Sequence, residues 1–262
     1  MADHDATADT WAIQCEDVDV CYRQGRTEQR VLDRLSLSVT RGEVVSLLGP
    51  SGCGKSTLLR VIAGLIAPTS GMVRIDGQDV RAARNKLAFV FQESALLPWR
   101  SVWQNVRLPC ELRRDVVGQE LSDRIEHALQ LVGFKPTDWH KKPSQLSGGM
   151  KMRASIARAL ITQPQILLMD EPFAALDDML RSKLNDLLLS IVAESGCTLL
   201  FVTHNISEAI YLSHAIAIMS HGRIAQKCVV DLPFPRSAEL RSRPEFAQQY
   251  GMVLEALTRS EA

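Results

Sequence analysis

The stretch Gly49-Pro50-Ser51-Gly52-Cys53-Gly54-Lys55-Ser56 matches in full the pattern of a phosphate-binding loop. It follows an apolar run over residues 44–48 and precedes a helix-compatible segment that begins near residue 56. Successive backbone N–H groups of such a loop form a concave anion site, and the N-terminus of the next helix adds positive dipole. The stretch therefore predicts a nucleoside triphosphate site, where Lys55 reaches the β- and γ-phosphates and Ser56 offers its hydroxyl to magnesium. The alternative is a chance glycine-rich turn.

Composition and charge limit the classes of protein to which the chain can belong. Its 262 residues, with 46% hydrophobic and 23% charged, suit one soluble α/β domain with an inserted or appended subdomain. Thirty basic and thirty acidic side chains cancel, so no electrostatic footprint for a nucleic acid is expected. The first ten residues lack the basic and apolar parts of a signal peptide, and no stretch approaches the roughly 20 apolar residues of a membrane span. We expect a cytoplasmic protein.

The first half of the chain reads mostly as strands. Short apolar or alternating segments predict strands at 13–22, 35–39, 44–48, 72–75 and 87–91, and the helix after the loop should stop at Gly64. From residue 99 to 142 the pattern changes, because Leu121, Ile125 and Leu129 recur at helical spacing. These residues predict an inserted helical subdomain over about 95–150.

Two acidic residues follow a second apolar run. Residues 166–169 are continuously apolar, as in a parallel strand that is buried on both faces, and Asp170 and Glu171 come at its carboxyl end. Asp170 is placed to hold magnesium directly or through water, and Glu171 to polarise an attacking water as a general base. The alternative is a charged pair that simply ends a strand. A further buried strand is predicted over 198–203 and ends at His204.

The segment Leu146-Ser147-Gly148-Gly149 precedes another predicted helix, which ends before Pro164. Ser147 can cap this helix, and the two glycines expose backbone N–H groups at its N-terminus. The segment therefore predicts a second anion-binding site that is built without a lysine.

Taken in order, the loop, a glutamine, the Leu-Ser-Gly-Gly segment, the Asp-Glu pair and the histidine resemble the ATP-binding cassette (ABC) ATPases over about residues 13–230. The resemblance implies an α/β fold: a P-loop NTPase core with an antiparallel β subdomain and an inserted helical subdomain. It implies an ABC ATPase domain over 11–232, a C-terminal helical tail over 233–262, and ATP and Mg²⁺ as cofactors.

The same resemblance assigns roles to individual residues. Gln92 resembles the glutamine that contacts magnesium and relays the state of the transmembrane subunit, and Tyr22 the aromatic residue that stacks on adenine, although a tyrosine there also suits core packing. Asp177 resembles an aspartate of the dimer interface, and His204 the switch histidine that contacts the γ-phosphate. The implied catalytic residues are Lys55, Glu171 and His204; the implied magnesium contacts are Ser56, Gln92 and Asp170; the implied nucleotide contacts are Tyr22, Gly49, Pro50, Ser51, Gly52, Cys53, Gly54, Lys55, Ser56, Thr57, Gln92, Ser147, Gly148, Gly149 and Asp177.

Three residues, Met150, Met152 and Cys53, lead to expectations of their own. The family's signature segment usually continues with two glutamines, which Met150 and Met152 replace here, so their hydrogen bonds must be absent or remade. Cys53 lies inside the phosphate loop, where a helix N-terminus can stabilise a thiolate. We expect alkylation of Cys53 to abolish nucleotide binding and ATP to protect it; the alternative is an inert small side chain.

The resemblance also implies an assembly. One loop and one Leu-Ser-Gly-Gly segment from opposite copies would grip each ATP, so the chain is expected to form a head-to-tail homodimer on transmembrane permease subunits, at the cytoplasmic face of the inner membrane. An extracytoplasmic solute-binding protein would be an indirect partner. Residues 96–99, Leu-Leu-Pro-Trp, and 244–246, Pro-Glu-Phe, are similar to importers of nitrate, sulfonates and taurine. The alternatives are a soluble ABC-type ATPase and a nucleotide-binding scaffold without turnover.

Overall fold

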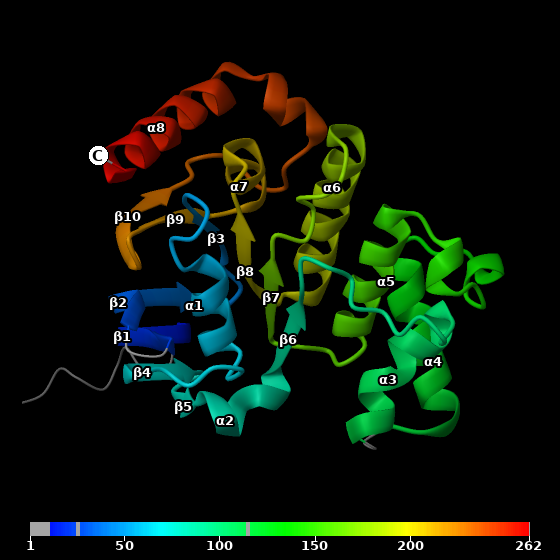
Figure 1. Ribbon diagram of the computed structural model, residues 1–262. Coiled ribbons are helices and arrows are strands. Elements are labelled where there is room, and N and C mark those ends of the chain that lie inside the picture. The colour runs from blue at the N-terminus through cyan, green and yellow to red at the C-terminus, as the bar shows by residue number, and fades with distance from the viewer. Residues whose placement is uncertain (1–10, 25–26, 114–115, 262) are drawn as a thin grey trace, which may run out of the picture.

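The computed structural model describes residues 11–24, 27–113 and 116–261, which fold around two sheets (Figure 1). The larger sheet has the strand order β10-β9-β3-β8-β7-β6, in which β9, β3, β8, β7 and β6 run parallel and β10 is an antiparallel edge. Its strands are β3 (Val44–Leu48), β6 (Leu87–Val90), β7 (Ile166–Asp170), β8 (Thr198–Thr203), β9 (Ala215–Ser220) and β10 (Arg223–Val229). The strands predicted at 44–48 and 198–203 have the observed bounds, and the one predicted at 166–169 extends to Asp170.

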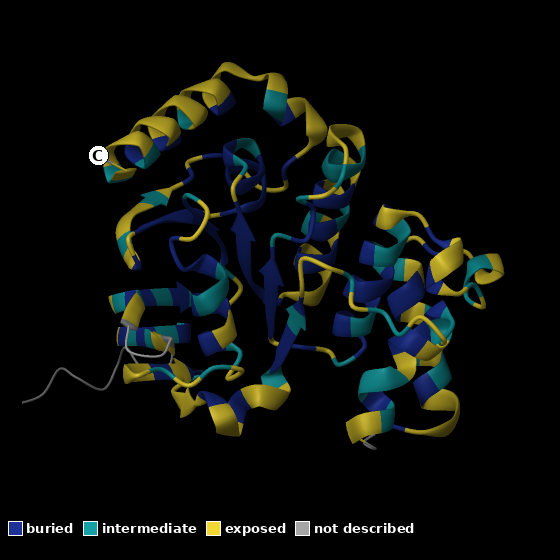
Figure 2. Cartoon of the chain, viewed as in Figure 1, coloured by how far each residue is buried: buried dark blue, intermediate teal, exposed yellow. Residues whose placement is uncertain are grey.

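The larger sheet is covered on both faces. Every residue of β3, β7, β8 and β9 is buried, which gives the dark blue centre of Figure 2. Val44 and Leu48 of β3 belong to the same apolar cluster as the large group of helices. Val45 and Leu47 face the opposite way, into the cluster formed with the smaller sheet and the first helix. This two-sided burial explains why the strands are continuous apolar runs without alternation.

The smaller sheet is antiparallel, in the order β2-β1-β4-β5. It consists of β1 (Trp11–Gln24), β2 (Thr27–Thr40), β4 (Ser70–Ile75) and β5 (Gln78–Asp79), and the short helix α2 (Val80–Ala83) follows it. Both β1 and β2 are longer than predicted. The outer part of β2, Glu28 to Arg30, is polar and exposed, so it carries no alternation that would mark a strand.

The helices form three groups. Helix α1 (Lys55–Ile62) follows the phosphate loop, and α3 (Val102–Arg113) and α4 (Gly118–Leu131) pack against α5 (Gly148–Leu160). Helices α6 (Asp178–Ser195), α7 (Ile206–Leu212) and α8 (Pro244–Glu261) complete the chain, and α8 packs over α7 and the β9–β10 hairpin (Figure 1). Helix α4 buries the predicted residues Leu121, Ile125 and Leu129. In the part of the chain that the structure describes, no helix is both long and apolar enough to traverse a bilayer. The domain boundaries at 95, 150 and 232 stay predictions.

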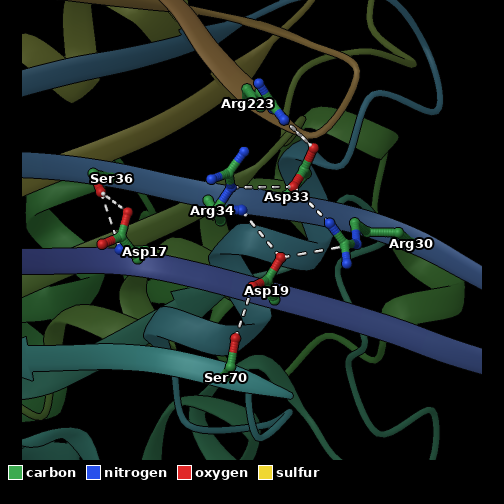
Figure 3. A network of polar contacts seen from close by, with 8 residues as sticks. All are labelled: Asp17, Asp19, Arg30, Asp33, Arg34, Ser36, Ser70 and Arg223. Atoms are coloured by element: carbon green, nitrogen blue, oxygen red, sulfur yellow. Dashed lines mark hydrogen bonds and ion pairs between the residues drawn. The ribbon is translucent and has the colours of Figure 1, made fainter.

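A polar network connects the two sheets at their edges (Figure 3). Asp33 of β2 accepts hydrogen bonds from Arg223 Nε of β10 and from Arg30 Nη1, both at 2.9 Å. Asp19 of β1 accepts one from Ser70 Oγ of β4 at 2.7 Å. The bond from Arg223 lowers the pKa of Asp33, and the bond from Ser70 lowers the pKa of Asp19, so both carboxylates stay ionised near neutral pH.

The turn between β9 and β10 lies between this network and the phosphate loop. Gly222 donates its N–H to the carbonyl of Cys53 at 3.2 Å, and its own carbonyl accepts from the N–H of Asp33 at 3.0 Å. His221 and Gly222 both have positive φ, 49° and 76°, as in a type I′ hairpin turn. A Cβ on Gly222 would lie 2.5 Å from the carbonyl oxygen of Val31. The turn therefore braces the phosphate loop only if residue 222 is glycine.

Substitution of Gly222 tests this bracing against a matched turn. Asp76 and Gly77 have nearly the same φ values, 48° and 74°, but a Cβ on Gly77 would meet nothing within 4 Å. We predict that Gly77→Ala lowers the free energy of unfolding by about 1–2 kcal/mol, the cost of a left-handed alanine. Gly222→Ala should cost about 1–3 kcal/mol more because of the steric overlap. Equal losses in denaturant titrations of the two variants would contradict the bracing.

Candidate functional site

The phosphate loop connects the carboxyl end of β3 to the N-terminus of α1. Gly54 takes the N-cap position of α1 with a φ of 105°, and a Cβ there would lie 2.9 Å from the carbonyl oxygen of Val31. Only glycine fits this backbone and this approach to β2. The sharp turn directs the loop's N–H groups and the start of α1 toward the same side of the sheet, as an anion site requires.

Lys55 lies inside the loop that it follows. Its side chain is buried, and Nζ donates to the carbonyl oxygens of Gly49 at 2.8 Å and Pro50 at 2.9 Å. The ammonium group is therefore held at the centre of the loop by main-chain oxygens. A triphosphate that entered the loop would offer this cation anionic oxygens in place of neutral ones.

Ser56 and Asp170 form a hydrogen-bonded pair of oxygen ligands. Ser56 Oγ at the start of α1 donates to Asp170 Oδ1 at the end of β7, over 2.7 Å. Burial raises the pKa of Asp170, and the hydrogen bond from Ser56 and the charge of Arg60 lower it. A hydroxyl and a buried carboxylate are hard oxygen donors of the kind that Mg²⁺ prefers. A cation here would also stabilise the ionised carboxylate, so the residues present fit the predicted magnesium.

Glu171 and His204 meet at the same edge of the sheet. Strands β7 and β8 are neighbours in parallel register, with Asp170 opposite Val202, so the residues after each strand end lie close together. Glu171 Oε2 is 3.1 Å from His204 Nδ1, and the Glu171 N–H donates to the carbonyl of Val202 at 3.1 Å. Glu171 has a left-handed φ of 44°. The carboxylate of a candidate base is thus held by His204, and its backbone is held by β8.

Most of these residues line one pocket of about 350 Å³. The loop residue Gly52 and the helix residue Thr57 lie on one side, and Gln92 and Glu171 come from the segments after β6 and β7. The complete lining is Val31, Ser51, Gly52, Gly54, Lys55, Ser56, Thr57, Gln92 and Glu171. Val31 has no counterpart in the sequence predictions, because it lies between the polar residues 28–30 of β2 and the strand predicted at 35–39.

The Leu-Ser-Gly-Gly segment starts α5, as predicted. Ser147 is the N-cap, and its Oγ accepts from the N–H of Met150 at 3.3 Å. A Cβ on Gly149 would lie 2.6 Å from Leu180 Cδ2 of α6, so this glycine permits close packing of the two helices. Ser147, Gly148 and Gly149 are not among the described residues that line the pocket. In Figure 1, β6 and β7 stand between α1 and α5. One copy of the chain therefore does not bring its two predicted anion sites together.

Two further predicted contacts lie away from the pocket. Asp177 is the N-cap of α6 and accepts from the N–H of Leu180 at 3.0 Å. It therefore stabilises the start of this helix, and a contact at a dimer interface would be an additional role. Tyr22 is 39% exposed near the outer end of β1, so its ring does not belong to the core. Stacking of Tyr22 on adenine and an interface contact of Asp177 stay predictions.

Burial of Cys53 opposes the thiolate that the sequence suggested, and the expected effects of alkylation and ATP protection stay predictions. The side chain is buried, and burial raises the pKa of its thiol; the charge of Lys55 lowers it by less. The helix N-terminus does not outweigh desolvation, and Cys53 serves as a small packing residue in the loop. Packing also explains the methionines of the signature helix: Met152 is buried in the helical core and Met150 packs partly buried against it.

Comparison with known proteins identifies the family of the chain. The model of a family described as "ABC transporter" matches residues 32–174. The chain belongs to this ABC transporter family. The aliphatic sulfonates import ATP-binding protein SsuB of Bacillus cereus is 42% identical to this ABC cassette over 87% of the chain and 89% of the relative. The nitrate import ATP-binding protein NrtD of Synechococcus elongatus is 38% identical over 97% and 94%.

Solved structures with a similar fold are also ATP-binding cassettes. A dimeric post-hydrolysis state of the ATP-binding cassette MJ0796, bound to ADP and Pi, superposes with a TM-score of 0.77 at 33% identity, over 84% of this chain and all of that one. The cassette cbiO1 of Clostridium perfringens superposes with a TM-score of 0.77 at 26% identity over 94% of this chain and 96% of its own. The predicted ABC ATPase fold, with its ATP-binding and ATPase character, is confirmed.

Alkylation kinetics test the corrected role of Cys53. We predict that iodoacetamide at pH 8 modifies Cys53 more slowly than the partly exposed Cys21, by about tenfold or more, since the buried thiol is mostly protonated. Peptide mass spectrometry of the native protein would give both rates. In denaturant the two rates should converge, which serves as the control. Faster modification of Cys53 in the native protein would restore the thiolate hypothesis.

Proposed function

We propose that this chain is the ATP-hydrolysing subunit of a membrane ABC importer, which couples ATP-driven dimer closure to uptake of a small anionic solute such as nitrate, a sulfonate or taurine. The relatives named for sulfonate and nitrate import support the importer and the solute class. The observation that carries the ATPase activity is the contact between Glu171 and His204, which joins a carboxylate of the phosphate pocket to an imidazole.

The residues in and beside the pocket would have separate roles in ATP hydrolysis. The N–H groups of the loop and Lys55 would bind the phosphates, and Ser56, Asp170 and Gln92 would hold a magnesium ion, which supplies charge neutralisation when bound. Glu171 would accept a proton from the attacking water. His204 would keep the carboxylate of Glu171 in place and contact the γ-phosphate. Each role uses an atom that already lies at the carboxyl edge of the larger sheet.

The second half of each site would come from another copy of the chain. Ser147 and the N–H groups of Gly148 and Gly149 begin α5, and in one copy they lie away from the pocket. In a head-to-tail dimer they would close over the γ-phosphate bound by the partner. ATP would then favour the closed dimer, and hydrolysis would remove the group on which that preference depends. The dimeric state of MJ0796 supports such an arrangement.

A rigid apolar loop supports attachment to a permease. Trp99 is 68% exposed, so it does not pack inside the helical group. Asn105 of α3 fixes the segment that presents Trp99, because it accepts from the N–H of Leu97 at 2.7 Å and donates to the carbonyl of Arg100 at 3.1 Å. We place the chain as a peripheral subunit at the cytoplasmic face of the inner membrane, with an extracytoplasmic solute-binding protein as an indirect partner. A soluble ABC ATPase would have no need of this surface.

The general base is tested by an isosteric change. We predict that Glu171→Gln lowers the kcat of ATP hydrolysis by about 100-fold or more, because the amide cannot accept the proton of the attacking water. ATP should still bind, since the loop is untouched, and the variant should form a dimer with ATP that persists in size-exclusion chromatography. Glu194→Gln, an exposed carboxylate on α6, is the control. Full turnover in Glu171→Gln would overturn the proposed mechanism.

The importer assignment is tested separately by purification of the wild-type chain from membranes. We expect it to co-purify with a membrane permease, and its failure to do so would overturn the importer assignment.

The magnesium ligands are tested by titration of the metal. We predict that Ser56→Ala raises the Mg²⁺ concentration needed for half-maximal activity by about tenfold or more, because the site loses an oxygen ligand. ATP binding in the presence of EDTA, measured with a fluorescent analogue, should be unchanged. Ser190→Ala removes a serine hydroxyl on α6 that bonds only to the carbonyl of Leu187 among the described residues, and it should leave the titration unaltered. An unshifted titration in Ser56→Ala would remove Ser56 from the site.

A further inference from the structure

A buried carboxyl group lies on α7, four residues after His204 in the chain. Glu208 of α7 is 5% exposed and is not one of the residues that line the pocket. Burial raises its pKa, and the hydrogen bond from Thr203, the charge of Arg181 and the amide of Asn185 lower it. An ionisable side chain so placed costs stability unless its contacts serve a purpose.

Glu208 is hydrogen-bonded to both chain neighbours of His204. Thr203 Oγ1 at the end of β8 donates a short hydrogen bond to Glu208 Oε2 and accepts one from the N–H of Asn205 at 3.0 Å. Asn205 Oδ1 caps α7 by accepting the N–H of Glu208 at 3.0 Å. Thr203, Asn205 and Glu208 therefore close a ring of hydrogen bonds, which fixes the residues immediately before and after His204.

The helix that carries Glu208, α7, packs against α6. Asn185 and Arg181 are one helical turn apart on α6, and both stabilise the ionised form of Glu208. Arg181 also donates to the carbonyl oxygens of Leu176 at 2.8 Å and Phe173 at 3.4 Å. Glu208 thus lies between the segment that carries His204 and the segment 173–177, which leads from Glu171 to the cap of α6.

The buried polar side chains of Glu208 and Asn185 destabilise the core more than apolar side chains would. Glu208 Oε1 and Asn185 Oδ1 are buried acceptors that have no hydrogen-bond donor among the described residues. Each such atom costs stability that a leucine of similar volume would avoid. Packing therefore does not explain these polar side chains. The hydrogen bonds of Glu208 to Thr203 and Asn205, the neighbours of His204, indicate a role in positioning that residue.

We propose that Glu208 is a positioning residue for ATP hydrolysis: through Thr203 it fixes His204 against Glu171, and through α6 it ties this pair to residues 173–177. The inference rests on the proposed function. Glu208 touches neither the phosphate loop nor the pocket, so its loss should slow turnover and leave the affinity for ATP unchanged. A change in the segment 173–177 on dimer closure would reach His204 along the same contacts.

The test compares two threonines of one strand. Thr203 and Thr198 are both buried at the ends of β8, but Thr198 Oγ1 accepts only from the N–H of Gly42 among the described residues, at the far end from His204. We predict that Thr203→Val lowers the kcat of the full-length protein by about tenfold or more with KM for ATP within about twofold, since only positioning of the reacting groups is lost. Thr198→Val should keep both constants.

A second pair of variants separates hydrogen bonding from charge and from packing. Glu208→Gln retains an acceptor for Thr203 and should restore most of the activity, whereas Glu208→Leu should resemble Thr203→Val. Equal kcat losses in Thr203→Val and Thr198→Val, a raised KM, or a Glu208→Gln as slow as Glu208→Leu would each overturn the proposal.

A spectroscopic readout keeps the positioning role separate from the proposed function. The imidazole resonance of His204, assigned by its absence in His204→Ala, should shift or broaden in Thr203→Val and stay in place in Thr198→Val. If the wild-type protein shows no ATPase activity, the proposed function fails, and this resonance still decides whether Thr203 and Glu208 position His204. An unmoved resonance in Thr203→Val would refute the inference.

Discussion

The register of the parallel strands β3, β7 and β8 is the constraint on which the rest of the structure depends. Leu48 lies opposite Thr203, and Asp170 lies opposite Val202, so all three strands end at one edge. The phosphate loop, the acidic pair and the histidine leave the sheet there as the next residues of the chain. A slip of one residue would turn each buried side chain to the other face and move its reactive neighbour out of reach. The register that buries the apolar side chains of these strands is thus the same register that brings the functional residues together.

The sequence was informative wherever a short local pattern sets the structure. The strands at 44–48 and 198–203 are runs of apolar residues that can be satisfied only inside a covered sheet, and the capping serine at 147 precedes the helix that it starts. The loop, the acidic pair and the histidine could be named because each directly follows such a strand. The fold and the main parts of the pocket were therefore predictable from residues close to one another in the chain.

What the sequence did not reveal depends on contacts between distant segments. Residues 28–30 of β2 are polar and exposed, and they form a strand through pairing with β1. Val31 follows them outside every predicted strand, so its contribution to the pocket carried no signal. The pKa of Cys53 depends on how deeply the loop is covered, which the residues beside it do not show. Glu208 follows His204 at helical spacing, a weak sign that its side chain lies near the same site. Its partners on α6 became evident only in three dimensions.

The brace beneath the phosphate loop has a consequence for how the protein is made. The loop leaves the ribosome before the turn at Gly222 and the strand β9 that flanks β3, because both follow it by a long stretch of sequence. The nascent chain must carry the loop without its support until β9 and the turn at Gly222 have emerged. Its nucleotide site is therefore completed only after β9 and the turn have been synthesised, and a chain truncated before β9 would hold the full motif without the contacts that support the loop.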